Sequence, residues 1–309
     1  YIMIKNYKNK GVAMITAMMI VAIVSLITIN LLWENTLNTR KVITNINRDQ
    51  AIQVAIGVES WVKELLIQDA KISESDHLGE FWARQLPNLP IDGGLIKGEI
   101  YDLQSNFNIN NLVKKNGEVD QNQLKFFERI LSNLNLNPII ANAIIDWIDS
   151  DQYTTYPDGA EDDIYTKLNP AYRAANQKII SVSELLAISS INMEVYEIME
   201  PYVTSIPEYS KINVNTAPPL ILKSLDDGIS ESQIKRLIEE RRGTGYDDIT
   251  VTFKPILDSN NLLNVTNKTN YFQLKLQVKI DNISILMYSM IKREPQNSAS
   301  IVYRSFGTI

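Results

Sequence analysis

The 309-residue sequence has no cysteine and only one histidine, His77. Without cysteine, neither a disulfide framework nor a thiolate metal site can form. A single histidine excludes metal sites built from several imidazoles and argues against catalysis by a histidine-activated nucleophile. His77 lies in the polar run KISESDHLGE, which predicts a solvated loop histidine. The absence of cysteine agrees with a location outside the cytoplasm.

The sequence also lacks a strong excess of either charge, with 30 basic and 36 acidic residues and a net charge of −6. Non-specific binding to nucleic acid depends on lysine and arginine contacts with phosphate, so this composition gives no reason to expect it. The length predicts one large domain or two moderate ones beyond any membrane segment.

One long segment contains no charged side chain, namely the 22 residues from Val12 to Trp33. As a helix it would span about 33 Å, enough to cross a hydrocarbon core of about 30 Å. Gly11 stands directly before it and is itself preceded by basic residues: Lys5, Lys8 and Lys10. The pattern predicts a membrane-spanning helix whose basic flank stays in the cytoplasm.

Three interpretations of this segment differ in how the chain is processed. A cleaved secretory signal has a shorter apolar core and a small-residue exit site, and neither is present. A plain single-span anchor fits the length and the lysines. The third interpretation is a type IV prepilin-like leader, cut after Gly11 so that Val12 becomes the N-terminus. The local pattern does not choose between the last two. The opening Tyr1-Ile2-Met3 suggests that Met3 is the true start.

The fifth residue after that cut is Thr16, where most pilins carry glutamate. The glutamate offers a counter-charge to the N-terminal amine of a neighbouring subunit inside the membrane, where an unpaired charge is costly. Thr16 therefore either argues against a pilin or fits a subunit at the end of a filament, with no neighbour above it. In an ordinary anchor its hydroxyl would bond to its own helix backbone.

Beyond the membrane, apolar residues recur at helical spacing and predict one long helix that continues to about Ile67. A short helix around Phe81-Trp82 is expected in the polar loop that follows. Alternating patterns predict an antiparallel sheet, from four strands: residues 95–104, 271–280, 283–293 and 300–306. Residues from 105 to about 250 show mainly helical signals. The predicted fold class is α+β, with the long helix packed on the sheet and a large helical insertion.

The helical span contains a faint internal repeat, in which Asn-x-Asn at 108–110 returns at 213–215, and residues 136–149 align with 229–242. The second copy resembles a helix-hairpin-helix DNA-binding module, whose hairpin presents backbone N–H groups to phosphate. Here the hairpin has a single glycine and two acids, which would repel phosphate. The helical scaffold can thus be shared without DNA binding.

Between residues 146 and 163 acidic side chains crowd one Asp/Gly/Pro-rich stretch: Asp146, Asp149, Asp151, Asp158, Glu161, Asp162 and Asp163. Such crowding is repulsive unless a cation neutralises it, and calcium with oxygen ligands suits a flexible loop. The EF-hand template is not met, because Thr154 and Ala160 replace its glycine and glutamate. A solvated loop, or neutralisation by Arg173, stays open. No aromatic platform accompanies the acids, so no enzyme is expected.

An ordered set of motifs spans the chain: KGVAMIT, DLQSNFNINNL (102–112), DWIDSDQ (146–152), PDGAEDDIY (157–165), NPAYRAANQ (169–177), SVSELLAI (181–188) and INVNTAP (212–218). Together they resemble the K-type minor pseudopilins of bacterial type II secretion systems, the general secretion pathway protein K family. Lack of the glutamate at Thr16 matches that family.

The resemblance implies a subunit at the tip of the periplasmic pseudopilus that initiates or caps assembly with the minor pseudopilins I and J. It implies a Gram-negative inner-membrane protein, spanning once, with its globular part in the periplasm. Prepilin peptidase would cut after Gly11, and Val12 would be N-methylated. The implied domains are a leader (1–11), a transmembrane helix (12–33), a pilin-like domain (34–104 and 265–309) and a helical insertion (105–264).

The family also implies calcium in the insertion, and the candidate ligands are Asp149, Asp151, Glu161, Asp162 and Asp163. The rival hypothesis is a membrane-anchored helix-hairpin-helix protein that binds DNA during uptake. No nucleic acid is expected as a partner of a pseudopilin, so salt-sensitive DNA binding would separate the two.

Overall fold

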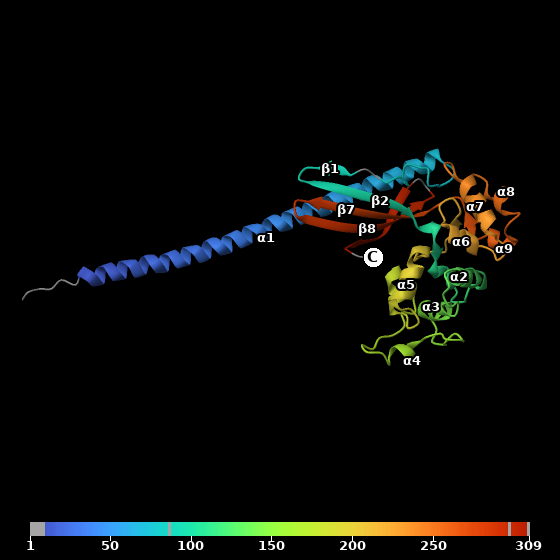
Figure 1. Cartoon of the computed structure of the whole chain (residues 1–309), viewed down its shortest axis with the longest axis horizontal. Coiled ribbons are helices and arrows are strands. Elements are labelled where there is room, and N and C mark those ends of the chain that lie inside the picture. The colour runs from blue at the N-terminus through green and yellow to red at the C-terminus, as the bar shows by residue number, and fades with distance from the viewer. Residues whose placement is uncertain (1–9, 86–87, 296–297, 308–309) are drawn as a thin grey trace, which may run out of the picture.

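The computed structural model describes residues 10–85, 88–295 and 298–307, so most of the expected leader lies outside the described residues. Its first element, α1 (Lys10–Ile72), is one helix of 63 residues, roughly 95 Å long. It projects from a globular head as a stalk (Figure 1). Among the described residues, α1 is the one helix whose length and composition would let it cross a membrane.

The two halves of α1 have different surroundings. From Val12 to Trp33 the apolar side chains are exposed, whereas four residues in the second half are fully buried against the sheet: Ala51, Ala55, Val62 and Leu66. The hydroxyl of Thr16 donates to the backbone oxygen of Ala13 at 3.0 Å, and three later threonines bond their own helix in the same way. These hydroxyl groups are thereby satisfied within the helix and do not depend on water.

The head is built on a five-stranded antiparallel sheet in the order β1-β2-β7-β8-β9. Its strands are β1 (Leu89–Ile91), β2 (Gly94–Asp102), β7 (Tyr271–Ile280), β8 (Ile283–Glu294) and β9 (Ser298–Phe306). Alternate residues of β7 are buried because one face of the sheet packs on α1. The ion pair between Glu59 of α1 and Arg304 of β9 fixes the helix to this face, with N–O distances of 2.6 and 2.9 Å.

The chain between β2 and β7 forms the insertion, which has its own hydrophobic core. Its helices are α2 (Gln121–Asn133), α3 (Ile140–Ile148), α4 (Asp162–Tyr165), α5 (Met193–Met199), α6 (Pro219–Ser224), α7 (Glu231–Glu240), α8 (Ile249–Phe253) and α9 (Ser259–Leu262). Short 3-10 turns connect them. Two parallel strand pairs are also present: β3 (Phe107–Asn108) with β4 (Val203–Thr204), and β5 (Ile212–Asn213) with β6 (Val265–Thr266). The fold is thus α+β with a large, mainly helical insertion, as predicted.

The Asn-x-Asn motifs have a structural role, because their first asparagine hydrogen-bonds to the backbone of its own turn and of a distant segment. The side-chain oxygens of Asn108 and Asn213 accept from the backbone N–H two residues on, at 3.2 and 3.0 Å. Their amides reach distant segments: Asn108 donates to Glu208 O, and Asn213 donates to Asp76 O. Both copies place such a turn before a helix pair, which accounts for the motif without a ligand.

Two local predictions are wrong in the loop after α1. Residues 81–84 form turns instead of a helix. Trp82 is held in place by its indole N–H, which donates to Glu80, and by edge-on contact with Phe272 of the sheet, at 5.1 Å between ring centroids. His77 is not solvated, because its side chain is only 15% exposed and its Nδ1 accepts from Gly79 N.

Candidate functional site

The structure brings three of the five predicted ligands into one group, in the loop between α3 and α4. Asp149 ends α3, Asp151 follows two residues later, and Glu161 precedes α4. One carboxylate oxygen from each residue lies within 4.8 Å of the others. Asp149 and Glu161 are buried, with 6% and 2% exposure, whereas Asp151 is exposed. The group is therefore a cluster of acidic oxygens with two buried members and one exposed member.

Three carboxylate oxygens of the buried members of this group have no hydrogen-bond donor in the described part of the chain. Among the described residues, none donates to Asp149 Oδ1 or to either carboxylate oxygen of Glu161. A buried carboxylate without a partner costs several kcal/mol in order-of-magnitude terms. Burial, and then repulsion from Asp146, Asp149 and Asp151, raises the pKa of Glu161 to about 7. Burial followed by repulsion from Asp151 and Asp146 raises the pKa of Asp149 to about 6.

A hard divalent cation fits this arrangement. It would pair with the oxygens that have no donor, and the exposed side at Asp151 leaves room for water among the ligands. The group contains no sulfur or nitrogen ligand, so its chemistry matches calcium better than zinc. The residues Asp149, Asp151 and Glu161 therefore fit a hard cation, and their role as ligands stays a prediction.

Asp146 shapes the loop and does not belong to the group. It is fully buried, and both of its carboxylate oxygens accept from Thr155 N at 3.1 Å. A Cβ at Gly159 would lie only 2.2 Å from Asp146 Oδ2, so the loop can close over this carboxylate only with glycine there. Backbone contacts around Asp146 thus hold Glu161 opposite Asp149.

Asp162 and Asp163 are among the predicted ligands, but they are not part of the group. Asp162 accepts from Ala174 N at 3.0 Å and lies 3.7 Å from the Nε of Arg173. Asp163 is exposed on the first turn of α4. Successive side chains of a helix point about 100° apart, so these two turn away from Glu161. The helix α4 was not predicted, and adjacency in sequence gave no sign of the difference.

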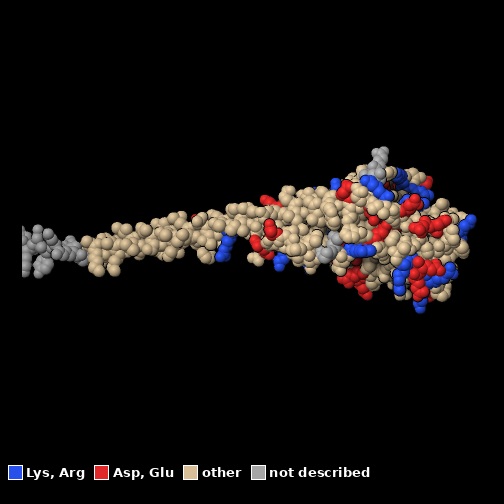
Figure 2. All heavy atoms as spheres, turned by 90° about the horizontal axis from the view of Figure 1, so that it is seen from above, with Lys and Arg blue, Asp and Glu red and all other residues tan. Residues whose placement is uncertain are grey.

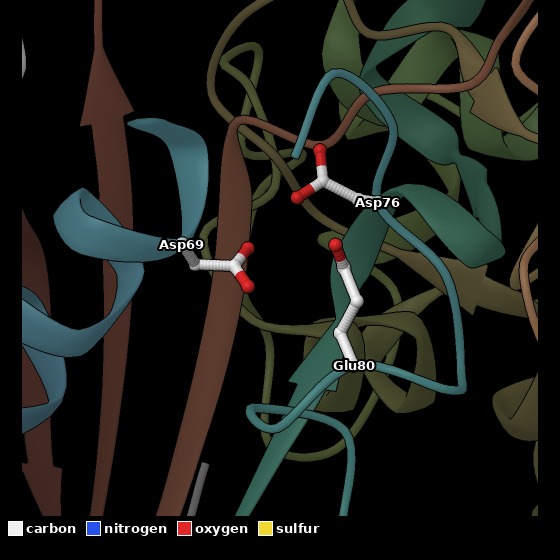
Figure 3. A group of neighbouring side chains, drawn as sticks. All are labelled: Asp69, Asp76 and Glu80. Atoms are coloured by element: carbon white, nitrogen blue, oxygen red, sulfur yellow. The ribbon is translucent and has the colours of Figure 1, made fainter. Parts of the chain in front are cut away.

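A second acidic group was missed. Asp69 in the last turn of α1, and Asp76 and Glu80 in the loop after it, offer oxygens within 4.8 Å of one another. Their carboxylates, from α1 and the loop that follows it, point toward a common centre (Figure 3). Arg293 of β8 pairs with Asp76 at 2.5 Å and lies 3.6 Å from Asp69. Burial, then repulsion from Glu80 and Asp76, raises the pKa of Asp69 to about 7.

In the hairpin that resembles a DNA-binding module, the backbone N–H of the glycine is already hydrogen-bonded and is not available to a phosphate. Gly228 N donates to Asp226 Oδ1 at 3.0 Å, and the other oxygen of Asp226 accepts from Asn261. Asp227 lies beside them with its side chain 86% exposed. A phosphate approaching here would meet carboxylates, so no observation favours the DNA-binding hypothesis.

Comparisons with known proteins agree with one another. Two family models described as type II secretion system (T2SS), protein K match residues 105–208 and 212–255. Type II secretion system protein K of Pseudomonas aeruginosa is 30% identical, over 97% of this chain and 93% of its own. That of Pectobacterium carotovorum subsp. carotovorum is 28% identical, over 97% of both chains.

A solved structure shares the fold. One chain of the crystal structure of the GspK-GspI-GspJ complex, from the type 2 secretion system of enterotoxigenic Escherichia coli, superposes with a TM-score of 0.78. The match covers 87% of this chain and all of that one, at 22% sequence identity. The resemblance found in the sequence motifs is confirmed. The chain belongs to the type II secretion system protein K family, whose members are one type of minor pseudopilin in type II secretion.

Proposed function

We propose that this minor pseudopilin forms the tip of the periplasmic pseudopilus, where it initiates or caps assembly. The observation that carries the proposal is the position of the insertion. It lies at the end of the head that is farther from the apolar half of α1 (Figure 1). If that half stands in the inner membrane, the insertion occupies the space into which the next subunit would stack.

The stalk supports assembly with other pseudopilins. Figure 2 shows charged residues gathered on the head, while the first half of the stalk carries none on the visible face. No charged side chain interrupts residues 12–33, so this surface can pack against similar helices in the membrane. By analogy with the solved complex, its partners would be the minor pseudopilins I and J.

Thr16 agrees with a terminal position. Its side chain carries no negative charge to offer to the N-terminal amine of a subunit above. A tip subunit has no such neighbour, so the glutamate of ordinary pilins would be an unpaired charge in the membrane. Thr16 avoids that cost.

Calcium would stabilise the insertion at the group of Asp149, Asp151 and Glu161. The bound ion supplies positive charge to the three carboxylates. The residues of this chain then hold α3 and α4 at a fixed separation, because Asp149 and Glu161 come from the facing ends of these two helices. The cap would thereby keep a defined surface at the end of the filament.

The tip position can be tested by labelling filaments. With the major pseudopilin overproduced, pseudopili detached from cells would be treated with gold-labelled antibody against the insertion. We expect label at one end only, together with I and J pseudopilins in a detergent-solubilised complex of equal stoichiometry. An antibody against the major subunit serves as the control for access. Label along the whole filament would contradict the capping role.

Processing has a separate test. We expect the protein recovered from membranes to begin at Val12 and to carry one extra methyl group when the host has prepilin peptidase. The reason is that Gly11 follows a basic flank and directly precedes the apolar segment. Intact mass spectrometry in hosts with and without the peptidase measures this. An uncut N-terminus in both hosts would instead indicate an ordinary anchor.

A further inference from the structure

We propose that Asp69, Asp76 and Glu80 form a second site for a hard divalent cation, in the pilin-like part of the molecule. This site lies at the junction of α1, the loop that follows it and β8, and it shares no residue with the calcium group of the insertion. Figure 3 shows the three carboxylates converging from α1 and the loop.

The charges around this centre do not balance. Arg293 is the one cationic side chain that the described residues place in ion-pair contact with these carboxylates, apart from His77 when protonated. Its Nη2 donates to Asp76 Oδ2 at 2.5 Å and to Thr269 O at 2.6 Å. When all three carboxylates are ionised, one guanidinium leaves two of their negative charges unpaired. One divalent cation would neutralise them.

An independent observation points to a ligand here. The side chain of Glu80 is 7% exposed, and its Oε1 has no hydrogen-bond donor among the described residues. Its other oxygen is occupied, because it accepts from Trp82 Nε1 at 2.7 Å and from His77 N at 3.0 Å. These two bonds fix the carboxylate, so Oε1 is held toward the centre. Within the described part of the chain, the Oδ2 atom of Asp69 also has no hydrogen-bond donor, because the nearest cationic atom, Arg293 Nη1, lies 3.6 Å away.

His77 does not supply the missing charge or hydrogen bond in this arrangement. Its Nδ1 accepts from Gly79 N at 3.1 Å, so a neutral ring carries its proton on Nε2. Nε2 lies 4.0 Å from Glu80 Oε1, which is too long for a hydrogen bond. A cation between Asp69 and Glu80 would satisfy both oxygens. All three ligands offer carboxylate oxygen, which selects calcium or a similar hard ion.

The location gives the ion a structural task. Asp76 O accepts from Asn213 of the insertion at 3.0 Å, and Asp76 Oδ2 accepts from Thr269 N at 2.7 Å, just before β7. An ion that holds Asp76 to Asp69 would therefore connect the end of α1 to the point where the insertion returns to the sheet. It would set the orientation of the insertion relative to the stalk.

Counting bound ions in the intact protein and in two double variants tests the proposal. Equilibrium dialysis of the full chain in detergent with radioactive calcium, near neutral pH, should give two ions per chain. Asp69→Asn with Glu80→Gln should leave one, and so should Asp149→Asn with Glu161→Gln. The matched control is Glu74→Gln, an exposed acid of the same loop, which should keep two.

A spectroscopic signal assigns the ion to this site. Trp82 bonds directly to Glu80, so terbium bound here should emit when tryptophan is excited. In the Asp149→Asn, Glu161→Gln protein we expect this emission to persist, and to require at least tenfold more terbium after Asp69→Asn and Glu80→Gln. Circular dichroism checks that each variant is folded.

The outcomes separate the two sites. One ion per chain that is lost with Asp149 and Glu161, and no terbium emission without them, would overturn the second site and leave the proposed function intact. Binding that survives loss of Asp149 and Glu161 but not of Asp69 and Glu80 would support the second site. No ion in the intact protein would contradict both.

Discussion

Removing calcium from the group in the insertion should lower the melting temperature of the protein by about 5–10 °C, and substitution of Asp149 and Glu161 should remove this contribution. Calcium at one hundred times its dissociation constant stabilises a single site by about 2.7 kcal/mol. A change of 1 kcal/mol shifts the melting temperature of a domain of 150–250 residues by about 2–4 °C. Thermal unfolding followed by circular dichroism, with calcium or with chelator, measures the difference.

For the double variant Asp149→Asn, Glu161→Gln we expect the opposite effect on the melting temperature when calcium is absent. In chelator it should melt at the same temperature as the unchanged protein or higher, because the neutral amides remove repulsion between buried carboxylates. Asp163→Asn is the matched control and should retain the full response to calcium, since Asp163 is exposed. A double variant whose melting temperature responds to calcium as strongly as that of the unchanged protein would refute the ligand assignment.

Arg304→Ala should destabilise the pilin-like part by about 3–5 kcal/mol, because it leaves a buried charge without its partner. Glu59 is 1% exposed in the middle of α1 and accepts two hydrogen bonds from the Arg304 guanidinium of β9. Removing the arginine leaves this carboxylate facing an apolar sheet. Denaturant unfolding of the full chain, with the midpoint and slope fitted together, gives the free energy of unfolding.

Two comparisons make the Arg304 result specific. Replacing both partners by leucine should recover much of the loss, since burying two apolar groups is less costly than burying one unpaired charge. Arg236→Ala breaks a pair whose side chains are 75% and 40% exposed, and it should change stability by less than about 1 kcal/mol. Equal losses in both single variants would show that burial does not decide the effect.

The strands that pair in the centre of the sheet were visible in the sequence, and the reason is local. In β7 every second residue is buried against α1, so the alternation of Phe272, Leu274 and Leu276 with polar residues records the fold directly. The strand β1 has three residues, one of them Pro90, and carries too little pattern to detect. The short helix expected around Trp82 was wrong because the position of this side chain depends on Phe272, nearly two hundred residues later in the sequence.

The acidic sites show the same limit. Asp149, Asp151 and Glu161 lie within one short stretch of sequence, so the crowding of charge indicated that they lie close together. The same crowding did not indicate the helix α4, which turns Asp162 and Asp163 away from this group. The group of Asp69, Asp76 and Glu80 acquires its geometry from Arg293, 217 positions beyond Asp76. Sequence proximity contains no information on that contact.

The insertion leaves and re-enters the sheet at one place, because Asp102 at the end of β2 pairs with Phe272 near the start of β7. In topological terms it replaces a hairpin turn between two neighbouring strands. Doubling the length of a flexible loop costs only about 0.6 kcal/mol of closure entropy. The sheet thus tolerates great variation in what this connection contains, so the insertion could be enlarged, reshaped or exchanged during evolution while α1 and the sheet stayed unchanged.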